Sequence, residues 1–225
     1  EFLASNDNWF RPAQFANAPD GTLYVIDHYR EIIETIESIP PLILKHLHIN
    51  SGVNHGRIYR IVPDDFKRRP QPRLSKATTA ELVKLLEHPN GWHRDTASRL
   101  LYQRQDTQAA VPLLRDLARA TKSPLALAHA LHALDGMNSL RLDDVFPALT
   151  HASPRMREQA VKLLEPFQAE VKARQQLLTM CESEPDLRVR FQVAFTLGTV
   201  EGESATEGLY RLARRDAPDA WMRLA

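Results

Sequence analysis

Aromatic, guanidinium and carboxylate side chains gather near the start of the chain, at the ends of two short predicted strands. Aromatic rings and guanidinium groups in such places can stack on a planar ligand or pair with an anionic one. The candidate ligand-binding residues are Trp9, Arg11, Asp27, Tyr29 and Arg30. A structural interpretation is also open. In it, Trp9 and Phe10 pack the sheet, and the two arginines tie its loops to the aspartates at positions 20 and 27.

Histidines in the same part of the chain supply ligand types that a transition metal can use: His28, His46, His48 and His55. His46 and His48 would share one face if residues 39–48 formed a strand. They would point apart if the segment were helical, which the sequence favours at least as much. We therefore predict surface histidines and no metal site.

Other motifs that carry chemistry are missing from the sequence. It has no recognisable nucleophile–base–orienter set, no glycine-rich phosphate loop and no Cys-x-x-Cys-His motif for covalent haem. We expect no catalytic residue and no cofactor in this chain. The 29 basic and 28 acidic side chains nearly balance, which argues against nucleic-acid binding. No stretch approaches the ~20 apolar residues of a membrane span, so we expect no membrane insertion.

The strands themselves are marked by turn residues. Pro19-Asp20-Gly21 predicts a turn before a strand at residues 22–26, and a second strand is predicted at residues 57–62. With Ser38-Ile39-Pro40 and Lys45-His46-Leu47 between them, these stretches resemble the last β-propeller blade of certain membrane-bound dehydrogenase-like proteins. That family is typical of planctomycetes and verrucomicrobia and is similar to sorbosone and glucose dehydrogenases.

The resemblance covers residues 1–63 and carries functional implications. It implies a parent protein that is exported to the periplasm, is redox-active, and has helical repeats and a c-type cytochrome domain after the propeller. The present chain would then be a fragment of that protein, without most of the propeller and without the cytochrome.

The second half of the chain carries a repeat. Residues of helix-capping type recur at intervals of 31, 32, 33 and 33: Asn90, Thr121, Ser153, Asp186 and Asp219. Each precedes an inner helix. The predicted core leucines of the first four inner helices are Leu100, Leu131, Leu163 and Leu197. A second apolar helix precedes each of them. Thr78 with Glu81, and Ser204 with Glu207, have the spacing of capping boxes at two of these outer helices.

Helical pairs of this length, with Pro-Asp before the second helix, resemble the short HEAT repeats of bacteria. The resemblance covers residues 77–225 and implies a mainly α protein, an α-solenoid of about four and a half helical pairs preceded by the small β segment. In that family, aspartates and arginines form a ladder between units. The matching residues are Asp186, Asp219, Arg157, Arg190 and Arg223. Leu125 departs from the pattern and should interrupt the ladder.

These resemblances divide the chain into a partial propeller-like segment (1–63), a linker (64–76) and HEAT-like repeats (77–225). One predicted function is a non-catalytic, structural and linking part of an exported, cytochrome-associated dehydrogenase-like protein. The alternative is a scaffold that binds another protein on the concave face of the solenoid. The expected partner is therefore a protein, or the remaining domains of the parent chain.

Overall fold

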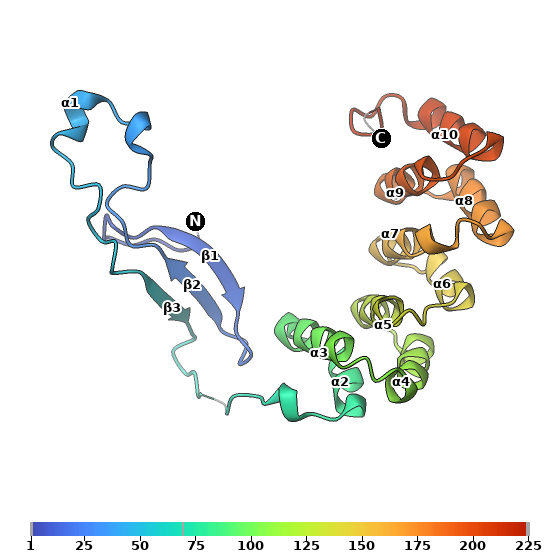
Figure 1. The fold of residues 1–225 in the computed structure, drawn as a ribbon, viewed down its shortest axis with the longest axis horizontal. Coiled ribbons are helices and arrows are strands. Elements are labelled where there is room, and N and C mark those ends of the chain that lie inside the picture. The colour runs from blue at the N-terminus through green and yellow to red at the C-terminus, as the bar shows by residue number, and fades with distance from the viewer. Residues whose placement is uncertain (1, 69, 224–225) are drawn as a thin grey trace. The chain divides into compact units, whose positions relative to one another are not determined.

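The computed structural model describes residues 2–68 and 70–223, which form three strands followed by a run of helices (Figure 1). The chain divides into two compact units. The first comprises Glu1–Arg73 with Asn90–Trp92, and the second comprises Leu74–Pro89 and His93–Ala225. Each unit is described separately below.

The first unit is built on an antiparallel sheet of order β1-β2-β3. Its strands are β1 (Pro12–Asn17), β2 (Leu23–Asp27) and β3 (Arg57–Ile61). Val25, at the centre of β2, is fully buried and pairs with Phe15 on one side and Tyr59 on the other. The two predicted strands are confirmed, and β1 adds a third.

The turn between β1 and β2 forms for the predicted reason. Gly21 has a φ of 86°, which a residue with a side chain adopts only with strain. Asp20 accepts hydrogen bonds from the backbone N–H (3.1 Å) and the hydroxyl (2.7 Å) of Thr22. The hydroxyl bond is the main cause that lowers the pKa of Asp20.

The segment between β2 and β3 contains only short helical pieces. They are a 3₁₀ turn at Ile36–Ser38 and the four-residue helix α1 at Pro41–Leu44. His46 and His48 follow α1 in turn and irregular backbone. The shared strand face considered for these histidines is therefore wrong, because the prolines at 40 and 41 start a helical turn instead of a strand.

The second unit consists of paired helices. After a 3₁₀ turn at Leu74–Lys76, the outer helices are α2 (Thr79–Leu85), α4 (Thr107–Ala120), α6 (Leu142–Leu149), α8 (Val171–Ser183) and α10 (Glu203–Asp216). The inner helices are α3 (Gly91–Arg104), α5 (Pro124–Gly136), α7 (Pro154–Lys162) and α9 (Leu187–Gly198), with a 3₁₀ turn at Glu165–Phe167. Figure 1 shows α4, α6, α8 and α10 in one row and α5, α7 and α9 in the other. The predicted mainly α solenoid is confirmed at this level.

The core lies between the two rows of helices. Leu131, Leu163 and Leu197 are at most 3% exposed, as the periodicity predicts. At the first inner helix the prediction is one residue out of phase, because Leu101 is buried (1% exposed) and Leu100 is only half-buried. The sequence contains two adjacent leucines there, and periodicity alone did not separate them.

The helix starts agree only in part with those predicted from the sequence. Thr78 and Glu81 form the predicted capping box, whereas α10 starts at Glu203 after Gly202, so the Ser204–Glu207 box is wrong. Thr121 is also not a cap, because α5 starts at Pro124 and is capped by Ser123, whose hydroxyl accepts the backbone N–H of Ala126. A polar residue shortly before a helix can stabilise the preceding turn instead of capping the helix.

Truncation of Leu131 tests the core assignment. Leu131→Ala should lower the free energy of unfolding by about 2–5 kcal/mol, because the side chain is fully buried and would leave a cavity. Leu125 lies on the same helix and is 56% exposed, so Leu125→Ala should change the free energy of unfolding by less than about 0.5 kcal/mol. Urea titration of both variants measures the difference, and equal effects would contradict the assignment.

Candidate functional site

Asp27 is the centre of the predicted cluster in the first unit. It is the last residue of β2 and is 1% exposed. Its Oδ1 accepts the backbone N–H groups of Arg11 and Tyr29, both at 2.8 Å. Its Oδ2 lies 3.5 Å from Nε of Arg57. Asp27 therefore holds the start of β1 and the exit of β2 in place.

Arg57 was not among the predicted site residues, yet it joins the cluster. Its guanidinium lies 3.5 Å from the centroid of the Tyr29 ring and forms an ion pair with Asp7 at 3.1 Å. The Tyr29 ring also contacts Trp9, with centroids 5.5 Å apart. Arg57 is directly opposite Asp27 in the β2–β3 register. Pairing the two predicted strands would have revealed it.

The two predicted arginines mainly tie loops. The Arg11 guanidinium donates to the carbonyls of Asn8, Phe10 (3.2 Å) and Glu31 (3.0 Å). The Arg30 guanidinium donates to the carbonyl of Ile49 at 2.7 Å. The structural interpretation expected these arginines to bind aspartates, and this part needs one change. Their guanidinium groups donate to backbone carbonyl oxygens, whereas the Asp27 carboxylate accepts backbone N–H groups.

A hollow of about 370 Å³ opens beside this cluster, and Asp27, Arg30 and Arg57 are among its lining residues. The loop that borders it makes a close approach at Gly52, where a Cβ would lie 2.2 Å from the carbonyl oxygen of Tyr29. The structure brings Trp9, Arg11, Asp27 and Tyr29 together, and places Arg30 beside them. Ligand binding by these five residues stays a prediction.

Removal of the Asp27 carboxylate tests its role. Asp27→Ala should speed hydrogen exchange in β1 and β2 by the equivalent of about 1–3 kcal/mol, because two half-buried N–H groups lose their acceptor. Asp65 is exposed, so Asp65→Ala should leave exchange unchanged. Exchange of the Tyr29 and Val25 amides in the full chain gives the measurement. Unchanged exchange in Asp27→Ala would show that the sheet does not depend on this carboxylate.

In the second unit, two arginines, Arg190 buried and Arg157 half-buried, connect successive helical pairs. Arg157 of α7 forms a two-pronged pair with Glu184 (2.9 and 2.6 Å), and Arg190 of α9 does the same with Asp216 (2.7 and 2.6 Å). These hydrogen bonds are the main cause that raises the pKa of both arginines. Each arginine also donates to carbonyls five and six residues before it, so it holds its own loop as well.

The acidic members of this ladder differ from the prediction. Asp186 accepts the N–H groups of Arg188 (2.9 Å) and Val189 (3.2 Å) at its own helix start. Asp219 does the same for the residues two and three positions after it. The carboxylates that face Arg157 and Arg190 follow them by about one repeat, at the ends of outer helices. Asp186 and Asp219 each use one oxygen, Oδ1, to accept the N–H groups that follow them, and the charge of Asp186 still adds to the causes that raise the pKa of Arg157 and Arg190.

The remaining ladder positions contain no such pair. Arg223 donates to the carbonyl of Ala217 at 3.2 Å. Leu125 is exposed, and the neighbouring helical pairs are joined on the outer side by Arg115 and Asp144, 3.1 Å apart. Among the described residues, the complete guanidinium–carboxylate ladder therefore covers only the pairs from α7 to α10.

Removal of one ladder charge should destabilise the helical unit. Asp216→Asn should lower the free energy of unfolding by about 3–5 kcal/mol, because Arg190 would stay buried without a counter-charge. Glu182 pairs with Arg211 at the surface, where its side chain is 65% exposed, and Glu182→Gln should have an effect below about 1 kcal/mol. Denaturant titration measures both, and a small effect of Asp216→Asn would contradict a structural ladder.

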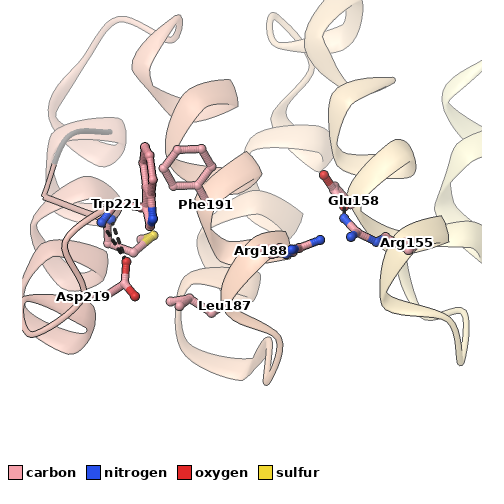
Figure 2. Close-up of a pocket in the computed structure, with 8 residues that line it drawn as sticks. Arg155, Glu158, Leu187, Arg188, Phe191, Asp219 and Trp221 are labelled. Atoms are coloured by element: carbon pink, nitrogen blue, oxygen red, sulfur yellow. Dashed lines mark hydrogen bonds and ion pairs between the residues drawn. The ribbon is translucent and has the colours of Figure 1, made fainter. Parts of the chain in front are cut away.

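A second hollow, also about 370 Å³, lies on the exposed side of the inner helices. We call it the inner groove. Figure 2 shows its lining side chains: Arg155 and Glu158 from α7, Leu187, Arg188 and Phe191 from α9, and Asp219, Trp221 and Met222 from the turn after α10. Sequence analysis named only Asp219 among them. The exposed side of an amphipathic helix gives no distinct sequence signal.

One arrangement resembles a nucleophile with its base, which sequence analysis did not find. Ser98 Oγ of α3 lies 2.9 Å from Nδ1 of His129 in α5, and Asp95 Oδ1 lies 3.8 Å from Nε2. Burial lowers the pKa of His129. The distance to Asp95 is too long for a hydrogen bond, so the ring lacks the orienting partner of a catalytic triad. The contact joins two inner helices.

In residues 2–68 and 70–223, no three His, Cys, Asp or Glu side chains are grouped so as to hold a metal ion. None of the helices that the structure describes is both long and apolar enough to cross a bilayer.

Two parts of the chain match known families. Residues 1–65 match a domain of unknown function (DUF7133). A comparison with curated proteins finds no match. Residues 142–225 match the HEAT repeats, so this part of the helical unit is similar to that family, which supports the predicted solenoid.

Proposed function

We propose that the helical unit is a protein-interaction scaffold whose partner binds on the exposed side of the inner helices. The main observation in support of this proposal is a stripe of apolar side chains on α9, spaced by four residues: Leu187 (36% exposed), Phe191 and Phe195 (50% exposed). The opposite side of α9 is buried against the stack. Phe191 and Phe195 contact each other edge to face, with centroids 4.8 Å apart.

Two physical arguments support a binding role for this stripe. Solenoids of stacked helical pairs present extended surfaces of this kind to their partners, and residues 142–225 are similar to HEAT repeats. Contiguous exposed aromatic side chains also mark interaction sites in soluble proteins, because leaving them in water is unfavourable.

Selection from a random peptide library displayed on phage tests this proposal with the purified chain. The selected peptides should bind at least about tenfold more weakly to Phe195→Ser, which removes a central apolar contact. They should keep their affinity for Tyr210→Ser, because Tyr210 is comparably exposed (56%) on the outer helix α10. Failure to select any binder, or loss of binding only with Tyr210→Ser, would contradict the proposal.

A linking role in a larger protein is the second candidate. It keeps the division into a propeller-like segment (1–63), a linker (64–76) and HEAT-like repeats (77–225). The parent would be an exported, periplasmic, cytochrome-associated dehydrogenase-like protein, with no cofactor held by this chain. The favouring observation is the sheet of β1–β3: every residue of β1 is exposed, as in a strand that has further sheet to join.

The sequence of the gene on either side of this chain tests the second candidate. Further Asp-Gly-x-Leu-Tyr-Val-x-Asp repeats upstream and a Cys-x-x-Cys-His motif downstream would support it. If the reading frame holds neither, the dehydrogenase-like parent is wrong.

A further inference from the structure

The inner groove has two chemically different ends. At one end, Leu187, Phe191 and Trp221 form an apolar wall, and Trp221 is 72% exposed (Figure 2). A hollow of about 370 Å³ is at the small end of the range for ligand pockets and suits one or two side chains of a peptide.

The other end carries an excess of positive charge. Arg188 extends towards α7, where Arg155 forms an exposed ion pair with Glu158 at 2.9 Å (Figure 2). Among the described residues, no ion pair involves the Arg188 side chain. Asp219, the other carboxylate of the groove, lies beside Trp221 at the apolar end and accepts two backbone N–H groups there. At the α7 end two guanidinium groups therefore face one carboxylate, and the local charge is positive.

We infer that the inner groove binds a linear peptide segment in which an apolar side chain lies next to a carboxylate. The apolar side chain packs between Phe191 and Trp221, and the carboxylate pairs with Arg188. This inference rests on the proposed scaffold function and names the chemistry of its partner. The carboxylate can come from an Asp or Glu side chain or from the end of a chain, and the test below separates these sources.

Charge and shape both favour a peptide over other occupants. A planar guanidinium binds a carboxylate through two parallel hydrogen bonds, and the adjacent aromatic wall gives an anchor pocket. A nucleic-acid strand would need a continuous row of cations to follow its phosphates. Here Glu158 pairs with Arg155, and Asp219 borders the apolar end.

Nuclear magnetic resonance of the full chain provides a direct test. Trp221 is one of three tryptophans, and its indole N–H signal can be assigned with Trp221→Phe. The probe is the acetylated and amidated peptide Gly-Leu-Phe-Glu-Gly. It should shift the Trp221 signal in a saturable way. The same peptide with Gln for Glu should bind on the order of fivefold more weakly. Gly-Leu-Phe with a free carboxyl end, compared with its amide, tests the second source of the carboxylate.

Two variants with the same change in net charge make the test specific. Arg188→Ala should weaken binding of the Glu peptide by about fivefold and should remove its advantage over the Gln peptide. Arg214→Ala should change neither, because Arg214 lies on α10 and faces Tyr210 (5.7 Å) outside the groove. Equal loss with both variants, or equal binding of the Glu and Gln peptides, would overturn the inference. So would tighter binding of a single-stranded oligonucleotide at the same signal.

Failure here can be told apart from failure of the scaffold proposal. If phage-selected peptides depend on Phe195 while the carboxylate probes leave the Trp221 signal unmoved, the inner groove inference is wrong and the scaffold proposal stands.

Discussion

A single helical pair cannot bury its apolar side alone, and this constraint governs the whole second unit. Each pair must pack on its neighbours, so leucines such as Leu131, Leu164 and Leu197 are at most 1% exposed. Arg157 with Glu184 and Arg190 with Asp216 add directed ion pairs to this packing, and loss of one partner would leave the other charge uncompensated. The apolar stripe of α9 lies on the side of the helix that does not pack against the stack, and it therefore stays exposed.

Much of the helical unit could be predicted because its signals are local. The spacing of leucines and capping residues sets the repeat, and three of four predicted core leucines are buried. The ladder partners were harder, because a carboxylate near a helix start can cap that helix or bridge to a neighbour. Asp186 caps and Glu184 bridges, although they are two residues apart. Only the three-dimensional arrangement decides between these roles.

The first unit shows the opposite balance between local and distant signals. Its turn at Gly21 follows directly from residue type, yet the partners of Asp27 come from residues 11, 29 and 57. The residue types at the ends of the predicted strands pointed to the cluster, but strand register was needed to place Arg57 in it. The inner groove was not predicted at all, because Arg155, Phe191 and Trp221 belong to three separate elements.

The missing arginine at Leu125 has a consequence for the stack. Between α5 and α7, the inner row has an exposed hydrogen bond between His132 and Gln159 (2.9 Å). The outer row at the same level keeps the Arg115–Asp144 pair. The contact between α5 and α7 therefore depends on apolar packing and this hydrogen bond, and no single lost charge can weaken it as the loss of Asp216 would weaken the contacts from α7 to α10.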